Sequence, residues 1–103
     1  MPLPEKQNQT ISLAEASKLT AKYRSTSPTS SKAQMFWKNE VQKILDQQSC
    51  VSLRCYFGTK DDGTPCLILV GADADGNDLE SGPLVEDGLP CPPFCPSSSS
   101  LSG

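Results

Sequence analysis

The first regular pattern along the chain is helical and begins at Leu13. Ser12 and Glu15 stand three positions apart, the spacing of a capping box, in which a serine hydroxyl accepts a hydrogen bond from a backbone amide of the first turn. From there to Arg24, apolar residues recur at the spacing that gathers them on one side of a helix. The segment is therefore expected to be an amphipathic helix lying on a core. Its core-facing side would consist of Leu13, Ala16, Leu19, Thr20 and Tyr23.

A second capping-box spacing occurs at Ser31 and Gln34. It predicts a second amphipathic helix that continues to about Gln48. Met35 and Phe36 project away from the apolar side of this helix. They either pack under the preceding loop or contact something outside the chain, so both are candidate interface residues. The core-facing side would consist of Trp37, Val41, Ile44 and Leu45.

From Cys50 the apolar repeat changes to every second residue, which is typical of a strand with one buried and one wetter face. Arg54 and Tyr56 fall on the wetter face and are candidates for an outward contact. Asp62-Gly63 supplies the positive φ expected of the turn that follows. The buried face would consist of Val51, Leu53, Cys55 and Phe57.

The next strand, from Cys66 to Ala72, is apolar without alternation, so it needs cover on both faces or a central position in a sheet. A two-stranded ribbon is only marginally stable by itself. We therefore expect a third strand from Asp78 to Val85, and also an edge and face contributed by a second copy of the protein.

These segments predict an α+β fold in which two N-terminal amphipathic helices pack on a small antiparallel β-hairpin or three-stranded sheet. An extended Cys/Pro-rich C-terminal segment follows. Residues 1–10 are expected to be extended or disordered, and residues 11–90 to form a single α+β domain. Residues 91–103 would be the Cys/Pro segment and a Ser-rich flexible tail.

The chain of 103 residues contains no histidine, the side chain that most often serves as a general base, a metal ligand or the partner of a nucleophile. No other motif that a known chemistry requires occurs either. The protein is therefore not expected to be an enzyme, and no cofactor is expected.

The net charge of −3 conceals two halves of opposite sign. Residues 1–49 carry seven Lys/Arg against four Asp/Glu, and residues 50–103 carry two against eight. Such a split favours a protein partner or a homo-oligomer over nucleic acid. The sequence has neither a secretory leader nor an apolar run of membrane-spanning length, so a cytoplasmic protein that does not bind membranes is expected, with export by a leaderless route left open.

Two of the five cysteines, Cys91 and Cys95, lie in a proline-stiffened segment and are a possible disulfide or thiol site. Three interpretations remain open. The pair forms a disulfide that pins the C-terminal segment, or packs as reduced residues, or acts in thiol exchange or soft-metal binding. The spacing of the five cysteines does not match that of zinc ribbons.

Asp73, Asp75 and Asp78 are weak candidates for binding a divalent metal ion, since carboxylates at such positions can direct oxygens into a loop. The register of a calcium-binding EF-hand fails, because its sixth and twelfth positions would be Asp78 and Leu84. The alternative is a polar turn in which Gly76 takes a positive φ.

Taken together, these features predict a small non-catalytic interaction or structural protein that self-associates or joins a larger assembly. The alternative hypothesis is a thiol-based redox or soft-metal protein acting through Cys91 and Cys95.

Overall fold

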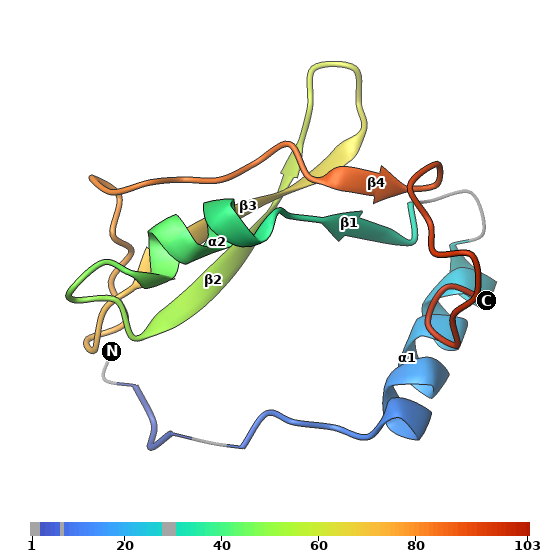
Figure 1. The fold of residues 1–103 in the computed structure, drawn as a ribbon, viewed down its shortest axis with the longest axis horizontal. Helices are drawn as coiled ribbons and strands as arrows, with labels where there is room; N and C mark the ends of the chain where they lie inside the picture. Colours follow the sequence, from blue (N-terminus) through green and yellow to red (C-terminus); the bar gives the residue numbers. More distant parts are fainter. Residues whose placement is uncertain (1–2, 7, 28–30) are drawn as a thin grey trace. The chain divides into compact units, whose positions relative to one another are not determined.

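The computed structural model describes residues 3–6, 8–27 and 31–103, which form a small mixed α+β fold with two helices and two small antiparallel sheets (Figure 1). The chain divides into two compact units. Unit 1 contains residues 36–88 and the N-terminal residues up to Glu5, and unit 2 contains residues 6–35 and 89–103. The elements, in chain order, are α1 (Leu13–Thr26), β1 (Ala33–Met35), α2 (Lys38–Leu45), β2 (Ser52–Thr59), β3 (Pro65–Ala72) and β4 (Leu89–Cys91).

The centre of unit 1 is the antiparallel hairpin of β2 and β3, in which Ser52 pairs with Ala72 and Thr59 with Pro65. Gly63 in its turn has φ +89°, which confirms the positive φ predicted there. Asp62 Oδ1 accepts hydrogen bonds from the Thr64 amide at 3.0 Å and from Thr64 Oγ1 at 2.7 Å. These bonds favour the ionised carboxylate and lower the pKa of Asp62.

The core of unit 1 forms where α2 packs on the hairpin. Ile44 of α2 is fully buried against Leu69 of β3 and Val85. Three partly buried residues surround this core: Phe36, Val41 and Cys50.

Trp37 was expected in the core, and that expectation is wrong. It is the N-cap residue of α2, and 65% of its surface is exposed. The reason is that the helix begins later than predicted, so Trp37 precedes the apolar stripe instead of belonging to it.

The continuous apolar strand β3 lies between β2 on one edge and the segment after residue 77 on the other. That segment is not the predicted third strand but makes two isolated bridges, Ala72 with Asp78 and Leu69 with Val85. The Leu69 and Val85 amides donate to each other's carbonyls at 2.7 and 3.0 Å. These bridges pair the second edge of β3, so that the strand has neighbours on both edges. The second half of β3 is buried, as expected of an apolar strand in a central position.

In unit 2, α1 begins as the capping-box spacing predicted. Ser12 Oγ accepts a hydrogen bond from the Glu15 amide at 3.1 Å. The helix ends at Thr26, two residues beyond the expected end. None of its residues is buried, so the prediction that α1 presents an apolar side to a core is not confirmed.

The second predicted helix start is wrong, because residues 33–35 form strand β1. Ala33 pairs with Cys91 and Met35 with Leu89 of β4, and the Lys32 amide donates to the Cys91 carbonyl at 2.7 Å. The backbone groups that a helical turn would have used are thus paired with a segment far along the chain. Helix α2 begins only at Lys38.

Candidate interaction surface

Strand β2 lies at the edge of its sheet. Within residues 3–6, 8–27 and 31–103, β3 is the only strand that pairs with it, so the other edge of β2 is open. An open strand edge presents backbone donors and acceptors that can pair with another chain. At eight residues, β2 is as long as β3, and its open edge is long for a small protein.

One face of β2 is apolar and exposed. Leu53 pairs with Gly71, Cys55 with Leu69 and Phe57 with Leu67, so these β2 residues share a face with the β3 residues. A Cβ built on Gly71 would lie 3.2 Å from Ile44 Cγ2, which identifies this face as the one that α2 covers.

The cover from α2 does not extend to the β2 residues of that face. Cys55 is exposed, and Phe57 is 90% exposed. The prediction that this face of β2 is buried is therefore wrong. Ile44 packs on Leu69 of β3 and does not cover the side chains of β2. We call Leu53, Cys55 and Phe57 the apolar strip.

The opposite face of β2 carries a polar cluster. Arg54 Nη1 donates to Asp78 Oδ1 at 2.5 Å and to the Gly76 carbonyl at 3.0 Å, and the Tyr56 hydroxyl donates to Asp78 Oδ2. Both predicted outward residues, Arg54 and Tyr56, are thus held by one carboxylate within the chain. Asp78 binds Arg54 through Oδ1 and Tyr56 through Oδ2, and these two hydrogen bonds fix the directions of the Arg54 and Tyr56 side chains.

The charges of this cluster reinforce one another. The hydrogen bond from Tyr56, followed by that from Arg54, lowers the pKa of Asp78. Hydrogen bonding to Asp78 raises the pKa of both Arg54 and Tyr56. The cluster therefore holds a cation, an anion and a neutral phenol at neutral pH.

The other two interface candidates are not among the residues that bind Asp78. Met35 is half-exposed in β1 and belongs to unit 2, whereas Phe36 belongs to unit 1 and packs against its core. Contact with the core of unit 1 therefore explains the apolar side chain of Phe36 without an external partner.

The three metal candidates have partners within the chain. Asp73 Oδ1 accepts from the amides of Asp75 and Asn77 at 3.0 and 2.9 Å, and Gly76 takes φ +83°. Asp78 is engaged by Arg54 and Tyr56. In the described part of the chain, no group of three or more cysteine or carboxylate side chains is placed to hold a metal ion.

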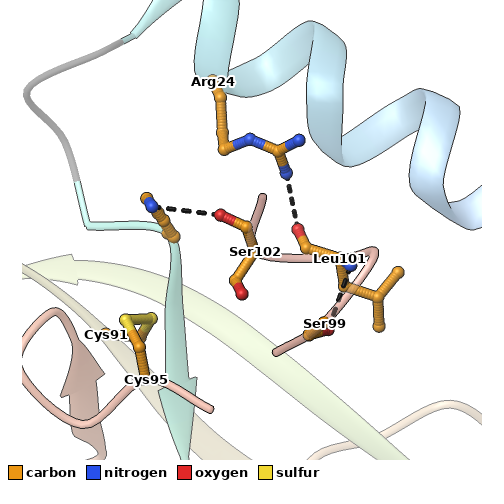
Figure 2. Close-up of a disulfide and its surroundings, with 7 residues drawn as sticks. Arg24, Cys91, Cys95, Ser99, Leu101 and Ser102 are labelled. Carbon is orange, nitrogen blue, oxygen red and sulfur yellow. Dashed lines mark hydrogen bonds between the residues drawn. A yellow bond between two sulfur atoms is a disulfide. The ribbon is translucent and has the colours of Figure 1, made fainter. Parts of the chain in front are cut away.

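In unit 2, Cys91 and Cys95 form a disulfide with a Cα–Cα distance of 4.7 Å (Figure 2). Cys91 is buried in β4, and Cys95 is exposed. The remaining cysteines are free thiols: Cys50, Cys55 and Cys66.

The chain beyond the disulfide is held by two cations. Arg24 Nη1 donates to the Leu101 carbonyl at 2.6 Å (Figure 2). Lys32 Nζ donates to the Ser102 carbonyl at 3.0 Å. Two backbone carbonyls of the C-terminal segment therefore accept side-chain hydrogen bonds within unit 2.

Sequence reasoning missed two long-range partners. One is Asp78 as the partner of Arg54. The other is Lys60, whose Nζ lies 2.9 Å from Asp87 Oδ1 and 3.5 Å from Glu86 Oε2. Hydrogen bonding to Asp87 raises the pKa of Lys60. Neither pairing has a local signal, because the partners are more than twenty positions apart.

No helix in the described ranges has both the length and the apolar character needed to cross a bilayer. Comparisons with protein family models, with curated proteins and with solved structures find no match to this chain.

Proposed function

We propose that this protein is a non-catalytic interaction protein that self-associates through the open edge of β2. The observation that carries the proposal is the apolar strip on a strand with one unpaired edge, in which Phe57 is 90% exposed. Joining this edge to another strand would satisfy its free backbone groups and remove apolar surface from water.

A second copy is the occupant that suits this edge best, because β2 is complementary to itself. It carries one cation, Arg54, and one exposed aromatic ring on the same face, Tyr56, which is bound to a carboxylate. Running antiparallel to itself, the strand can set Arg54 of one copy beside Tyr56 and Asp78 of the other. The apolar strip of one copy then meets the same strip of the other.

The rival mode of self-association is head-to-tail docking, in which unit 1 of one copy binds unit 2 of another copy. Unit 1 contains four Lys/Arg against eleven Asp/Glu, and unit 2 contains five against one, so the units carry net charges of −7 and +4. Docking of opposite charges weakens as salt screens them. Pairing β2 with β2 instead joins two acidic units, so added salt should leave it unchanged or strengthen it.

Light scattering coupled to size exclusion tests both modes in one salt series. We expect a dimer that persists or strengthens from low to high salt. Phe57→Ser should weaken it about tenfold or more, since the ring no longer leaves water on assembly. Phe94→Ser is the matched control, because Phe94 is an exposed phenylalanine in unit 2. A monomer at every concentration, or a dimer indifferent to Phe57→Ser, would contradict the proposal.

A second candidate function, thiol–disulfide exchange, is favoured by the disulfide between Cys91 and an exposed Cys95. An external thiolate would attack the Cys95 sulfur, form a mixed disulfide and release Cys91 as a thiolate. Incubation with reduced glutathione, followed by mass spectrometry, should then trap glutathione on Cys95. A bridge that resists glutathione in the folded protein would count against this function.

A further inference from the structure

We infer that two copies pair their β2 strands antiparallel about a twofold axis at Cys55, so that Arg54 of each copy faces Tyr56 of the other. In this register Leu53 faces Phe57, and Cys55 faces itself. The inference rests on the proposed self-association and adds to it the identity of the residues that meet.

The faces of the strand limit the registers that are possible. A shift of one residue would place the apolar strip opposite the polar face of the second copy, because side chains alternate along a strand. Only registers in which odd-numbered residues face odd-numbered residues keep Leu53, Cys55 and Phe57 on one continuous apolar face. A twofold register of this kind must be centred on a residue and not between two residues.

Charge removes two of the remaining registers. Centring the axis on Arg54 places two guanidinium groups opposite each other, and centring it on Phe57 places Arg54 opposite Lys60. Like charges directly opposite are destabilising in a sheet. Both residues are already held by carboxylates of their own chain, Arg54 by Asp78 and Lys60 by Asp87, so neither register offers them a new anion.

Two other registers that charge allows, centred on Leu53 and on Tyr56, pair less of the strand or leave side chains without a suitable neighbour. With the axis on Leu53, Phe57 faces residue 49, outside β2, and stays exposed. With the axis on Tyr56, Arg54 faces Gly58 and Leu53 faces Thr59. Arg54 then faces no aromatic ring, and Leu53 faces no apolar side chain. The register centred on Cys55 pairs residues 51–59, a range that includes the whole of β2.

That register also gives each side chain a suitable neighbour. Arg54 meets a phenol ring that already donates its hydroxyl to Asp78 of the second copy, an arrangement that attracts a cation. Leu53 and Phe57 form an apolar cross-strand pair on the opposite face, once on each side of the axis.

Cross-linking tests the register directly. Opposed residues of an antiparallel pair have Cα atoms about 4.5–5.5 Å apart, within the range of about 4.4–6.8 Å that a disulfide spans. Mild oxidation of the wild-type dimer with diamide should therefore link Cys55 to Cys55. Peptide mapping should show this link in preference to links through Cys50 or Cys66, and Cys55→Ser should abolish it.

A mixed pair of variants checks the ends of the strand. In the Cys55→Ser background, Val51→Cys and Thr59→Cys should cross-link when the two proteins are mixed, and neither should cross-link by itself. Both positions are exposed in a single copy, so the substitutions disturb no packed core.

The outcomes separate the register from the proposed function. A dimer that depends on Phe57 but gives no Cys55 link, or that links Val51→Cys to itself, overturns the register and leaves self-association through β2 standing. A protein that stays monomeric overturns both.

Discussion

Arg54 and Asp78, twenty-four positions apart in the sequence, form an ion pair in which Nη1 lies 2.5 Å from Oδ1. The pair joins the segment after β3 to the outward face of β2. It lies beside the bridge between Ala72 and Asp78, so one residue makes both a backbone and a side-chain contact to the hairpin.

Asp78→Asn should lower the melting temperature by a few degrees at neutral pH, since the charge that holds Arg54 is lost. The pKa of Asp78 is lowered in the folded protein, so its contribution is fully present above its unfolded pKa of about 3.9 and disappears as the pH falls through the lower folded pKa. Thermal melts from pH 7 to pH 2 should show the wild type and variant converging only below about pH 4. If the melting temperatures of the wild type and Asp78→Asn differed by the same amount from pH 7 to pH 2, the ionised Asp78 carboxylate would not be the source of the difference.

Ile44→Ala should destabilise unit 1 by about 2–4 kcal/mol, because it removes a fully buried side chain from the contact with Leu69 and Val85. Leu45→Ala is the matched control, since the next residue of α2 is exposed and its truncation should cost much less. Urea unfolding of both variants measures the difference. Equal losses would mean that α2 does not pack through Ile44.

Gly76→Ala should be destabilising for two reasons. Its φ of +83° is unfavourable for alanine by about 1–2 kcal/mol, and the added Cβ would lie 2.9 Å from Leu3 Cδ2. Gly63 has a similar φ of +89° but open space around it, so Gly63→Ala isolates the backbone cost. Chemical denaturation should rank wild type above Gly63→Ala and Gly63→Ala above Gly76→Ala. Leu3→Ala in the Gly76→Ala background should recover the steric part.

Cys91→Ser should destabilise unit 2 more than Cys95→Ser, although each breaks the same disulfide. Cys91 is buried in β4, so its replacement also buries a hydroxyl group, whereas Cys95 is exposed. Hydrogen exchange at the Met35 amide of β1, the strand paired with β4, reports the loss. Identical exchange in the two variants would show that burial of Cys91 adds nothing.

Short-range signals were sufficient where the partners are close in the sequence. The Ser12–Glu15 cap and the positive φ of Gly63 each depend on a few neighbouring residues. The alternation in β2 and the apolar run of β3 also located both strands of the hairpin. The same kind of signal failed at Ser31, because residues 33–35 pair with residues 89–91 and no local pattern reports such a distant partner.

The residues of the candidate surface were partly predictable for the same reason. Alternation singled out Arg54 and Tyr56 as outward residues of a strand, but it assigned Phe57 to a buried face. Which face of a strand is covered depends on where a helix packs, and Ile44 packs on β3. Asp78, the carboxylate that anchors Arg54 and Tyr56, has no such signal, because the sequence pattern marks it only as a weak metal candidate and as the start of a third strand.

The sequence by itself determined two local conformations, a capped helix and a β-hairpin. Its composition also shows that no histidine side chain is present. Tertiary structure alone decided that Asp78 binds Arg54, that Cys91 lies in a strand beside β1, and that Phe57 stays in solvent. The physical reason is range, since conformational preference acts over a few neighbouring residues, while burial and pairing depend on segments that meet only after the chain has folded.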